Sequence, residues 1–343
     1  MFKALLKALS EGKTLTKQEA KEAMDRMMQG NVAEAQVAGL LSMMRLRGET
    51  IAEMTGFALS MREHALGLDH SEPKLLDTCG TGGDDLSTFN ISTTTAIVVS
   101  ACGVKIAKHG NRAISSNSGS ADVLEALKIP VQASPEEAIT ALKDNGLCFL
   151  FAPLYHQSMK HVAATRKLLG FKTIFNLLGP LVNPAKANRQ MIGVFDTNFA
   201  EKMAETLREL GTERAVFVTG GDGIDECSIT TFTDVVELNG SQIKRYQLTP
   251  EEVGLERGEL IDIQATSVQE SATIIENILL GKANKTAENI VVLNSAMALY
   301  VAEEVGTVRE GVEKIQMVLR TGKAYQQFQK LQDKKEEIQA NVK

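Results

Sequence analysis

The sequence predicts an α/β fold in which a small N-terminal helical domain joins a large α/β domain with a mostly parallel central sheet. Residues 1–66 contain no proline and show only helical patterns. From about residue 71 onward, short apolar runs alternate with helical patterns, which is typical of strands joined by crossover helices. The length of 343 residues is enough for both units, because a single domain usually takes about 100–200 residues.

Two capping boxes mark helix starts in the N-terminal segment. Thr16 with Glu19, and Thr50 with Glu53, each precede apolar residues at helical spacing. A short amphipathic helix comes before them, and a further stripe ends at Gly48. Helices this short bury little apolar surface alone, so they must pack on the rest of the chain or on another subunit. Their Met-rich stripes are interpreted as plain core or as part of a dimer face, and the two interpretations can coexist.

The rest of the chain alternates between the two kinds of element. The predicted strands are 74–78, 104–107, 148–151, 191–195 and 215–219. The predicted helices cover 92–101, 119–128, 199–210 and 283–304, with further starts at Ser134-Pro135 and Thr249-Pro250 and a polar helix in the tail at 321–343.

Composition excludes several classes of protein. Lys and Arg number 37 against 43 Asp and Glu, which gives a net charge of −6 and argues against a chain-wide basic surface for nucleic acid. Aromatic residues make up 5% and tryptophan is absent, so base-stacking platforms are not favoured. No apolar run approaches the ~20 residues that span a bilayer, and the first residues lack the features of a secretory signal. Four widely spaced cysteines favour a reducing cytoplasm over a disulfide framework or zinc site.

The first candidate binding loop is Cys79–Asp84, directly after a predicted strand. Its three glycines in four residues let the backbone approach a ligand closely and direct N–H groups toward an anion. The segment 90–94 adds hydroxyl groups and free N–H groups at the next helix start. On its own, Ser92 is equally a simple N-cap.

The second candidate loop runs from Lys108 through Arg112 to Ser120. Cationic, amide and hydroxyl donors are concentrated here, which suits a phosphorylated ligand rich in hydroxyl groups. The alternative is a solvated loop whose serines cap the next helix. His109 is as well explained by packing or hydrogen bonding as by catalysis.

The third candidate loop, 220–226, carries the adjacent carboxylates Asp225 and Glu226 between glycines and a cysteine. Carboxylates suit Mg²⁺, which keeps several waters and takes its remaining ligands from substrate phosphates. Read alone, this loop is an acidic surface turn. Combined with the two donor-rich loops, it predicts magnesium-assisted chemistry on a phosphorylated or pyrophosphorylated substrate.

The order of these motifs resembles that of the anthranilate phosphoribosyltransferase family. The resemblance covers nearly the whole chain and rests on DTCGTGGD (77–84), TFNIST (88–93), KHGNRAISSNSGSADVLEAL (108–127), FLFAPLYHQSMKHV (149–162), TIFNLLGPLVNPA (173–185) and DGIDECS (222–228). It implies transfer of the 5-phosphoribosyl group of phosphoribosyl pyrophosphate to the amine of anthranilate, with release of pyrophosphate, in tryptophan biosynthesis. It also implies a homodimer formed through the helical domain. We expect that domain to comprise residues 1–70, completed by about 165–182, and the α/β domain to comprise 71–343.

The resemblance also implies roles for individual residues. Those expected to bind phosphoribosyl pyrophosphate are Gly80, Gly83, Asp84, Thr88, Asn90, Ile91, Ser92, Thr93, Lys108, His109, Gly110, Asn111, Arg112, Ala113, Ile114, Ser115, Ser116 and Ser120. Those expected to bind anthranilate are Gly80, Asn111 and Arg166. Those expected to bind Mg²⁺, at two ions per subunit, are Ser92, Asp225 and Glu226. Two positions depart from the family pattern: Asn117 stands where lysine is common, and Asp85 stands where glycine is common.

Catalysis is expected to depend on positioning and charge stabilisation, with Lys108 and Arg112 as the stabilising cations. No catalytic base is assigned, because the aryl amine of anthranilate already carries its lone pair at pH 7. His109 and His156 are the first candidates if a base is required. Two alternatives use the same architecture: a pyrimidine nucleoside phosphorylase, which needs no carboxylate pair for Mg²⁺, and a nucleic-acid-binding paralogue, which would show a basic groove and damaged loops.

Overall fold

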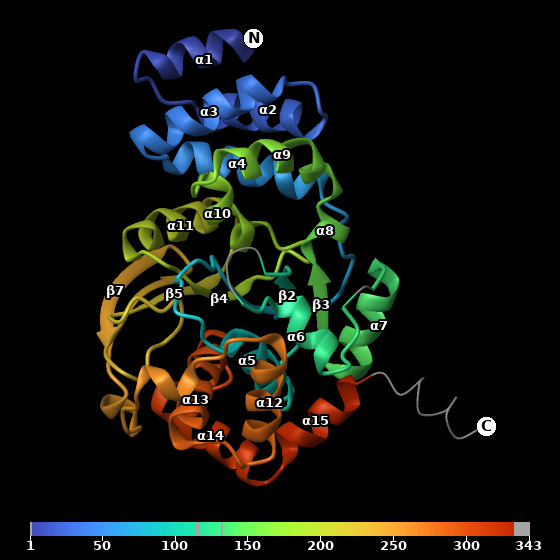
Figure 1. Cartoon of the computed structure of the whole chain (residues 1–343), viewed down its shortest axis with the longest axis vertical. Helices are drawn as coiled ribbons and strands as arrows, with labels where there is room; N and C mark the ends of the chain where they lie inside the picture. The colour runs from blue at the N-terminus through green and yellow to red at the C-terminus, as the bar shows by residue number, and fades with distance from the viewer. Residues whose placement is uncertain (1, 114–116, 132, 333–343) are drawn as a thin grey trace, which may run out of the picture.

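The computed structural model describes residues 2–113, 117–131 and 133–332. It shows a helical unit stacked on one side of a seven-stranded sheet, with a second layer of helices on the other side (Figure 1). Among the helices that the structure describes, none combines the length and apolarity that crossing a membrane requires.

The helical unit is built from two separate stretches of chain. The first stretch supplies α1 (Phe2–Ser10), α2 (Lys17–Met28), α3 (Glu34–Arg47) and α4 (Ile51–His64), and the second supplies α9 (Lys160–Leu169) and α10 (Ile174–Leu178). Thr16 and Thr50 form the expected capping boxes at the starts of α2 and α4. Helix α9 packs on α2 and α3, and α10 packs on α4. The Met-rich stripes face inward, since Met24, Met44 and Met54 are fully buried.

The sheet has the strand order β3-β2-β1-β4-β5-β6-β7. Its strands are β1 (Leu76–Gly80), β2 (Ile106–Gly110), β3 (Leu147–Phe151), β4 (Arg189–Gly193), β5 (Arg214–Gly220), β6 (Thr233–Asn239) and β7 (Gln242–Leu248). The first five are parallel to one another, and β6 and β7 add an antiparallel hairpin at one edge. The mostly parallel sheet that the sequence predicts is therefore confirmed.

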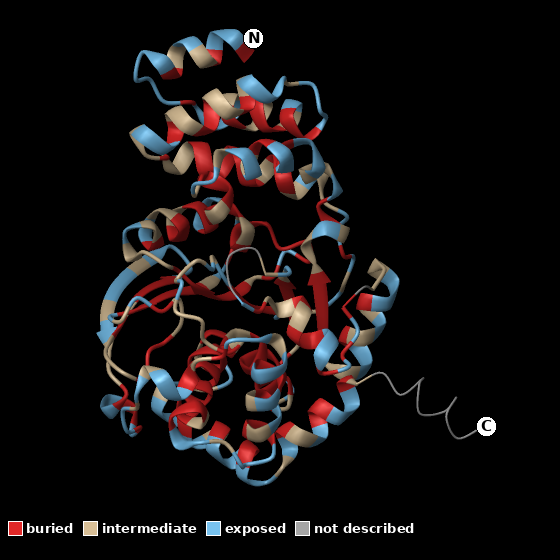
Figure 2. Cartoon of the chain, in the orientation of Figure 1, coloured by how far each residue is buried: buried red, intermediate tan, exposed pale blue. Residues whose placement is uncertain are grey.

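The remaining helices cover the faces and the edge of the sheet. They are α5 (Ile91–Ser100), α6 (Ser120–Ala126), α7 (Pro135–Asn145), α8 (Ala152–Tyr155), α11 (Thr197–Glu209), α12 (Val268–Leu279), α13 (Lys285–Val301), α14 (Val308–Arg320) and α15 (Lys323–Leu331). Helix α13 is buried along almost its whole length against α5 and α14 (Figure 2). The predicted tail helix is seen to Leu331, and positions 333–343 lie outside the described residues.

Strand side chains alternate between two apolar cores. Val216 and Val218 of β5 face the core formed with α5 and α13. Between them, Phe217 faces a core that continues through α11 into the helical unit, as the two-residue period of a strand requires. The second of these two cores is therefore shared by the helical unit and the sheet.

Two local predictions need correction, and one element was missed. The strand expected at 104–107 is observed at Ile106–Gly110, so Lys108 and His109 lie on a strand and not in the loop after it. The helix expected from Thr249-Pro250 is a single 3-10 turn, Glu251–Val253, which ends at Gly254 in the left-handed region (φ 82°). The hairpin formed by β6 and β7 was not predicted.

A substitution at Gly56 of α4 tests how closely α2 and α4 approach each other. A Cβ atom at this position would lie 2.3 Å from the Lys17 carbonyl oxygen and 2.8 Å from the Ala20 Cβ. We expect Gly56→Ala to force α2 and α4 apart and to lower the free energy of unfolding by about 2–3 kcal/mol, measured by urea unfolding. Gly39→Ala in α3 is the matched control, because its Cβ would meet only Leu6 at 3.9 Å; it should stabilise the chain by about 0.5–1 kcal/mol. Equal effects of the two variants would contradict the close approach.

Candidate active site

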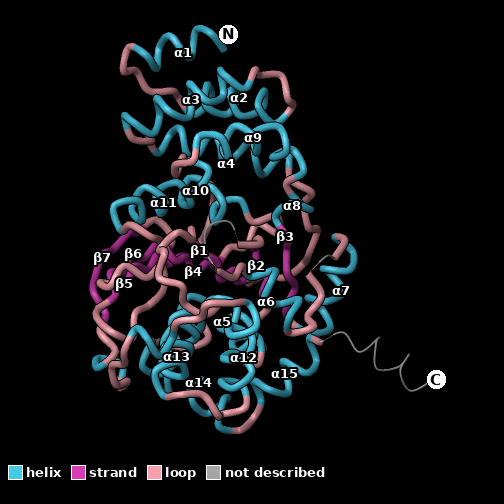
Figure 3. The backbone as a smooth tube through the Cα atoms, viewed as in Figure 1, coloured by secondary structure: helices cyan, strands magenta, loops and turns pink. Residues whose placement is uncertain are grey.

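The three candidate loops meet at one edge of the sheet. Because β1, β2, β4 and β5 are parallel, the loops that follow them emerge at the same edge. This edge faces the helical unit, and Figure 3 shows the loops gathered between the strands and helices α8 and α10.

The glycine-rich turn after β1 is anchored on two sides. Its Thr81 N–H donates to the Gly193 carbonyl at the end of β4 (2.9 Å), and its Gly82 N–H donates to the Asp225 carboxylate (2.9 Å). Gly82 and Gly83 have φ of 63° and 80°, values that glycine adopts without steric cost. The turn is thereby folded directly against the loop that follows β5.

Asp225 and Glu226 are half-buried and lie near Asp84. Burial, followed by repulsion from Asp84, raises the pKa of Asp225 to about 7. Burial and the neighbouring Asp225 raise the pKa of Glu226 well above its usual range. Concentrated, partly desolvated carboxylates are costly unless a cation neutralises them.

These oxygen ligands fit Mg²⁺. Within the described residues, no group of three or more His, Cys, Asp or Glu side chains forms a complete metal cage. Mg²⁺ is usually held by one or two protein carboxylates, with waters and substrate phosphates as its other ligands. Asp225 and Glu226 match that pattern, because a substrate would have to complete the coordination.

Lys108 and Ser92 join the first two loops to the carboxylates. The Lys108 side chain is buried, and its Nζ donates to the Thr78 carbonyl and to Ser92 Oγ (3.3 Å). The Ser92 backbone lowers the pKa of Glu226, although burial outweighs this effect. Burial lowers the pKa of Lys108, while the charge of Asp77 opposes that shift. The Lys108 ammonium thus contacts the Thr78 carbonyl of β1 and Ser92, close enough to Glu226 and Asp225 for their charges to raise its pKa.

The second loop is held by side chains from other elements. Asn90 accepts hydrogen bonds from Ser118 Oγ (2.7 Å) and Ser271 Oγ (2.8 Å). Arg112 pairs with Asp122 (2.9 Å) and Glu125 (2.6 Å) on α6. In this structure the Arg112 charge is therefore already neutralised, and its role in charge stabilisation stays a prediction.

His109 and His156 form a buried pair, with ring centroids 5.1 Å apart. Burial lowers the pKa of His109 to about 3, helped by His156, and lowers that of His156 to about 4. Among the described residues, neither Nε2 atom has a hydrogen-bond partner. Both rings are therefore neutral at pH 7 and offer an acceptor nitrogen.

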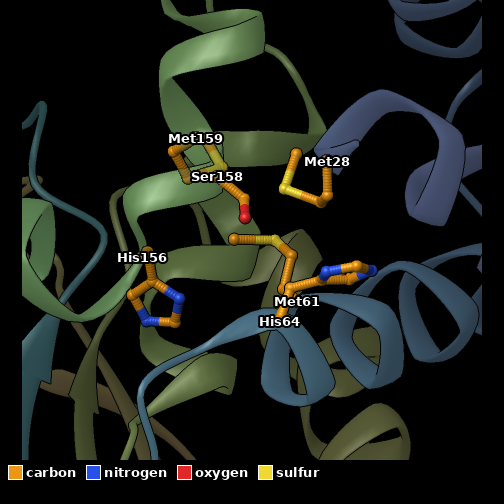
Figure 4. Close-up of a pocket in the computed structure, with 6 residues that line it drawn as sticks. All are labelled: Met28, Met61, His64, His156, Ser158 and Met159. Carbon is orange, nitrogen blue, oxygen red and sulfur yellow. The ribbon is translucent and has the colours of Figure 1, made fainter. Parts of the chain in front are cut away.

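His156 also lines a small cavity at the boundary with the helical unit. Figure 4 shows it there with Met28, Met61, His64, Ser158 and Met159. The cavity leaves essentially no room for a water molecule, so these side chains pack the two units together and do not form a ready-made substrate pocket.

Comparison with known proteins identifies the family. The family described as "Glycosyl transferase family, a/b domain" matches residues 72–325, and "Glycosyl transferase family, helical bundle domain" matches residues 3–65. The chain is 59% identical over 312 residues to the anthranilate phosphoribosyltransferase of Halalkalibacterium halodurans, which covers 91% of each chain. It is 56% identical to that of Geobacillus sp. (strain WCH70), which covers 98% of this chain and 99% of the relative.

The chain belongs to the anthranilate phosphoribosyltransferase family. Solved structures agree with this assignment. The enzyme from Thermus thermophilus superposes with a TM-score of 0.89 at 40% identity, which covers 95% of this chain and 97% of that one. The enzyme from Saccharomyces cerevisiae in complex with phosphoribosyl pyrophosphate and Mg has a TM-score of 0.87 at 28% identity and covers 96% of both chains.

The structure brings together most of the positions expected from this family. Gly80, Gly83, Asp84, Ser92, Lys108, Asp225 and Glu226 lie around the glycine-rich turn, with Asn90, Gly110, Asn111, Ala113 and Ser120 on the segments beside it. Thr88 forms a backbone bridge with Gln264. The side chains of Ile91 and Thr93 are buried in α5, so their backbone is the part that can face a ligand. Ile114, Ser115 and Ser116 lie outside the described residues.

Arg166 is the expected position that stands apart. It lies in the last turn of α9, with its guanidinium carbon 4.9 Å from the centroid of the Phe175 ring. In the part of the chain that the structure describes, no hydrogen bond or ion pair joins it to Gly80 or Asn111. Burial lowers its pKa. Its role toward anthranilate in this family member stays a prediction.

One contact to the glycine-rich turn was not predicted by the sequence. The Lys172 Nζ, between α9 and α10, donates to the Gly83 carbonyl (2.6 Å). A lysine in a surface-like loop gives no indication of a partner 89 positions away.

The buried histidines predict how stability depends on pH. The folded chain keeps both rings neutral, whereas the unfolded chain protonates them near pH 6.5, so their contribution is present above that pH and is lost as the pH falls toward about 3–4. We expect each to lower the free energy of unfolding by about 2 kcal/mol between pH 7 and pH 5, measured by urea unfolding. In the variant His156→Gln, the free energy of unfolding should fall by about 2 kcal/mol less over this pH range than in the parent chain. An equal fall in both chains would show that His156 titrates normally when folded.

The backbone conformation of Asp85 leads to a separate prediction about stability. It adopts φ 58°, which costs a residue with a Cβ more than it costs glycine. Asp85→Gly should raise the free energy of unfolding by about 0.5–1 kcal/mol, whereas Asp85→Asn removes the same charge and should change it by less than about 0.5 kcal/mol. Thermal unfolding measures both variants. If Asp85→Asn raised the free energy of unfolding more than Asp85→Gly, the effect would come from the charge of Asp85 and not from its backbone conformation.

Proposed function

We propose that this chain transfers the 5-phosphoribosyl group of phosphoribosyl pyrophosphate to the amine of anthranilate and releases pyrophosphate, in tryptophan biosynthesis. The assignment follows its curated relatives, which are anthranilate phosphoribosyltransferases at 48–59% identity. The observation that carries it is the half-buried pair Asp225 and Glu226, held against a glycine-rich turn that presents backbone N–H groups.

The chain's own residues would act by binding and orienting the substrates. The C1–oxygen bond to pyrophosphate breaks, the ribose ring takes up positive character, and the anthranilate nitrogen forms the new C1–nitrogen bond and then loses a proton. The glycine-rich turn and Lys108 would hold the departing pyrophosphate by N–H donation and charge. When bound, Mg²⁺ supplies Lewis-acid stabilisation of that leaving group. Ser92, Asp225 and Glu226 would hold it, and two ions per subunit are the number we infer from the family resemblance.

The two histidines limit the candidates for a base. With pKa values of about 3 and about 4, His109 and His156 are too weakly basic to remove a proton efficiently at pH 7. Their Nε2 atoms are also buried, so a substrate amine has no direct access to them in this structure. This supports a mechanism in which positioning, and not a strong general base, brings about the attack.

We also propose the remaining site roles and the assembly. Phosphoribosyl pyrophosphate would lie across the segments 80–93 and 108–120, and anthranilate would lie between Gly80, Asn111 and Arg166 on the helical side. The helical unit, which the sequence bounds at 1–70 completed by about 165–182 and whose second stretch begins at Lys160 with α9, would form a homodimer. The exposed side chains of Leu46 on α3 and Leu168 on α9, at 88% and 81%, support an interface on adjacent helices. The cytoplasmic location expected from cysteine usage stays a prediction.

Loss of anthranilate fluorescence in the presence of phosphoribosyl pyrophosphate, measured across a Mg²⁺ titration, tests the reaction. Replacing the carboxylates by the double change Asp225→Asn and Glu226→Gln should lower turnover by roughly 10²–10³-fold and raise the Mg²⁺ concentration needed for half-maximal rate, because the metal loses its charged ligands.

The matched control is the double change Glu136→Gln and Glu137→Gln. It removes two adjacent carboxylates at the start of α7, away from the proposed site, and should leave the titration unchanged. An unchanged titration in the Asp225 and Glu226 variant would refute their assignment. Consumption of anthranilate that is independent of Mg²⁺ in the parent chain would refute the metal requirement itself.

A further inference from the structure

The glycine-rich turn has a third anchor, which comes from the helical side of the molecule. Lys172 lies in the short connection between α9 and α10, and its Nζ donates to the Gly83 carbonyl at 2.6 Å. The contact is close: a Cβ atom on Gly83 would lie 2.9 Å from the same Nζ. It joins residues 89 positions apart in sequence.

The Lys172 ammonium also contacts an aromatic ring. Its Nζ lies 3.9 Å from the centroid of the Phe195 ring, within the range of a cation–π interaction. The Phe195 N–H in turn donates to Thr81 Oγ1 (3.1 Å). Lys172, Phe195 and Thr81 thus form a continuous chain of contacts that begins and ends at the turn.

This geometry determines the direction of one backbone group. In a trans peptide the carbonyl and the following N–H point in opposite directions, and the described residues contain no cis peptide bonds. With the Gly83 carbonyl directed at Lys172, the Asp84 N–H points away from the helical side. Among the described residues, that N–H has no protein acceptor, so it is available to an anion.

We propose that Lys172 is a positioning residue for the pyrophosphate-binding turn: it fixes the Gly83–Asp84 peptide so that the Asp84 N–H faces the bound pyrophosphate. The proposal rests on the proposed function of the turn and adds a residue to it. Lys172 acts through the peptide and does not touch the reacting atoms. It also links the connection between α9 and α10 directly to the turn, so that the helical unit and the pyrophosphate site share a contact.

The test compares three variants. Lys172→Met keeps the length of the side chain but removes the donor and the charge, whereas Lys172→Arg keeps both. Lys202→Met is the matched control, because the Lys202 Nζ also donates to a backbone carbonyl, that of Glu49, at 3.0 Å and in a partly buried setting. Steady-state kinetics with each substrate varied in turn, calorimetric binding of pyrophosphate with Mg²⁺, and thermal unfolding are measured for all three.

We expect Lys172→Met to raise KM for phosphoribosyl pyrophosphate, and to weaken pyrophosphate binding, by about 10–100-fold. This range corresponds to the loss of one charge-assisted hydrogen bond. KM for anthranilate should stay within about twofold, since that substrate does not contact the peptide. Lys172→Arg should recover most of the affinity, and Lys202→Met should alter neither KM.

Two results would overturn the proposal. One is pyrophosphate binding by Lys172→Met that equals that of the parent chain. The other is an equal rise in KM for both substrates together with a lowered unfolding temperature, which would indicate a structural role only. If the parent chain bound pyrophosphate but did not consume anthranilate, the proposed function would fail, and the comparison of pyrophosphate affinities would still decide the role of Lys172.

Discussion

The site depends on one constraint: the loop that carries Asp225 and Glu226 must cross directly over the ends of β1 and β4. Only glycine permits this approach. A Cβ on Gly193 would lie 1.6 Å from the Asp225 carbonyl oxygen, and one on Gly80 would lie 2.9 Å from its carboxylate. The close crossing lets Asp225 accept from the Gly82 N–H and brings its charge beside Asp84. The glycines, the raised carboxylate pKa values and the fit to Mg²⁺ all follow from it.

The features of the fold that could be predicted are those that depend on residues close together in the sequence. Capping boxes at Thr16, Thr50 and Ser134 locate helix starts because a cap needs only residues three positions apart. The hairpin of β6 and β7 was not predicted, since β7 is an edge strand with mostly exposed or half-buried residues and no apolar run. The only signal for this hairpin in the sequence was the two-residue connection at Gly240 and Ser241, which is typical of a tight turn between antiparallel strands.

The site was predictable in its motifs but not in its contacts. Glycine-rich and carboxylate-bearing loops after strands could be placed at one sheet edge, because parallel strands end together. The polar residues Lys108 and His109 concealed the continuation of β2, whose burial depends on neighbouring strands. The pairing of His109 with His156, the Arg112 ion pairs on α6 and the Lys172 contact each require knowledge of tertiary packing, which no local pattern contains.

The two-part construction of the helical unit has a consequence for synthesis. Helices α1–α4 emerge from the ribosome first, but α9, which packs on α2 and α3, begins 96 positions after α4 ends, from His64 to Lys160. At ~5–20 residues per second this delay lasts about 5–20 seconds. During that time the nascent chain carries an apolar bundle that α9 does not yet cover, and apolar surface exposed in this way promotes aggregation.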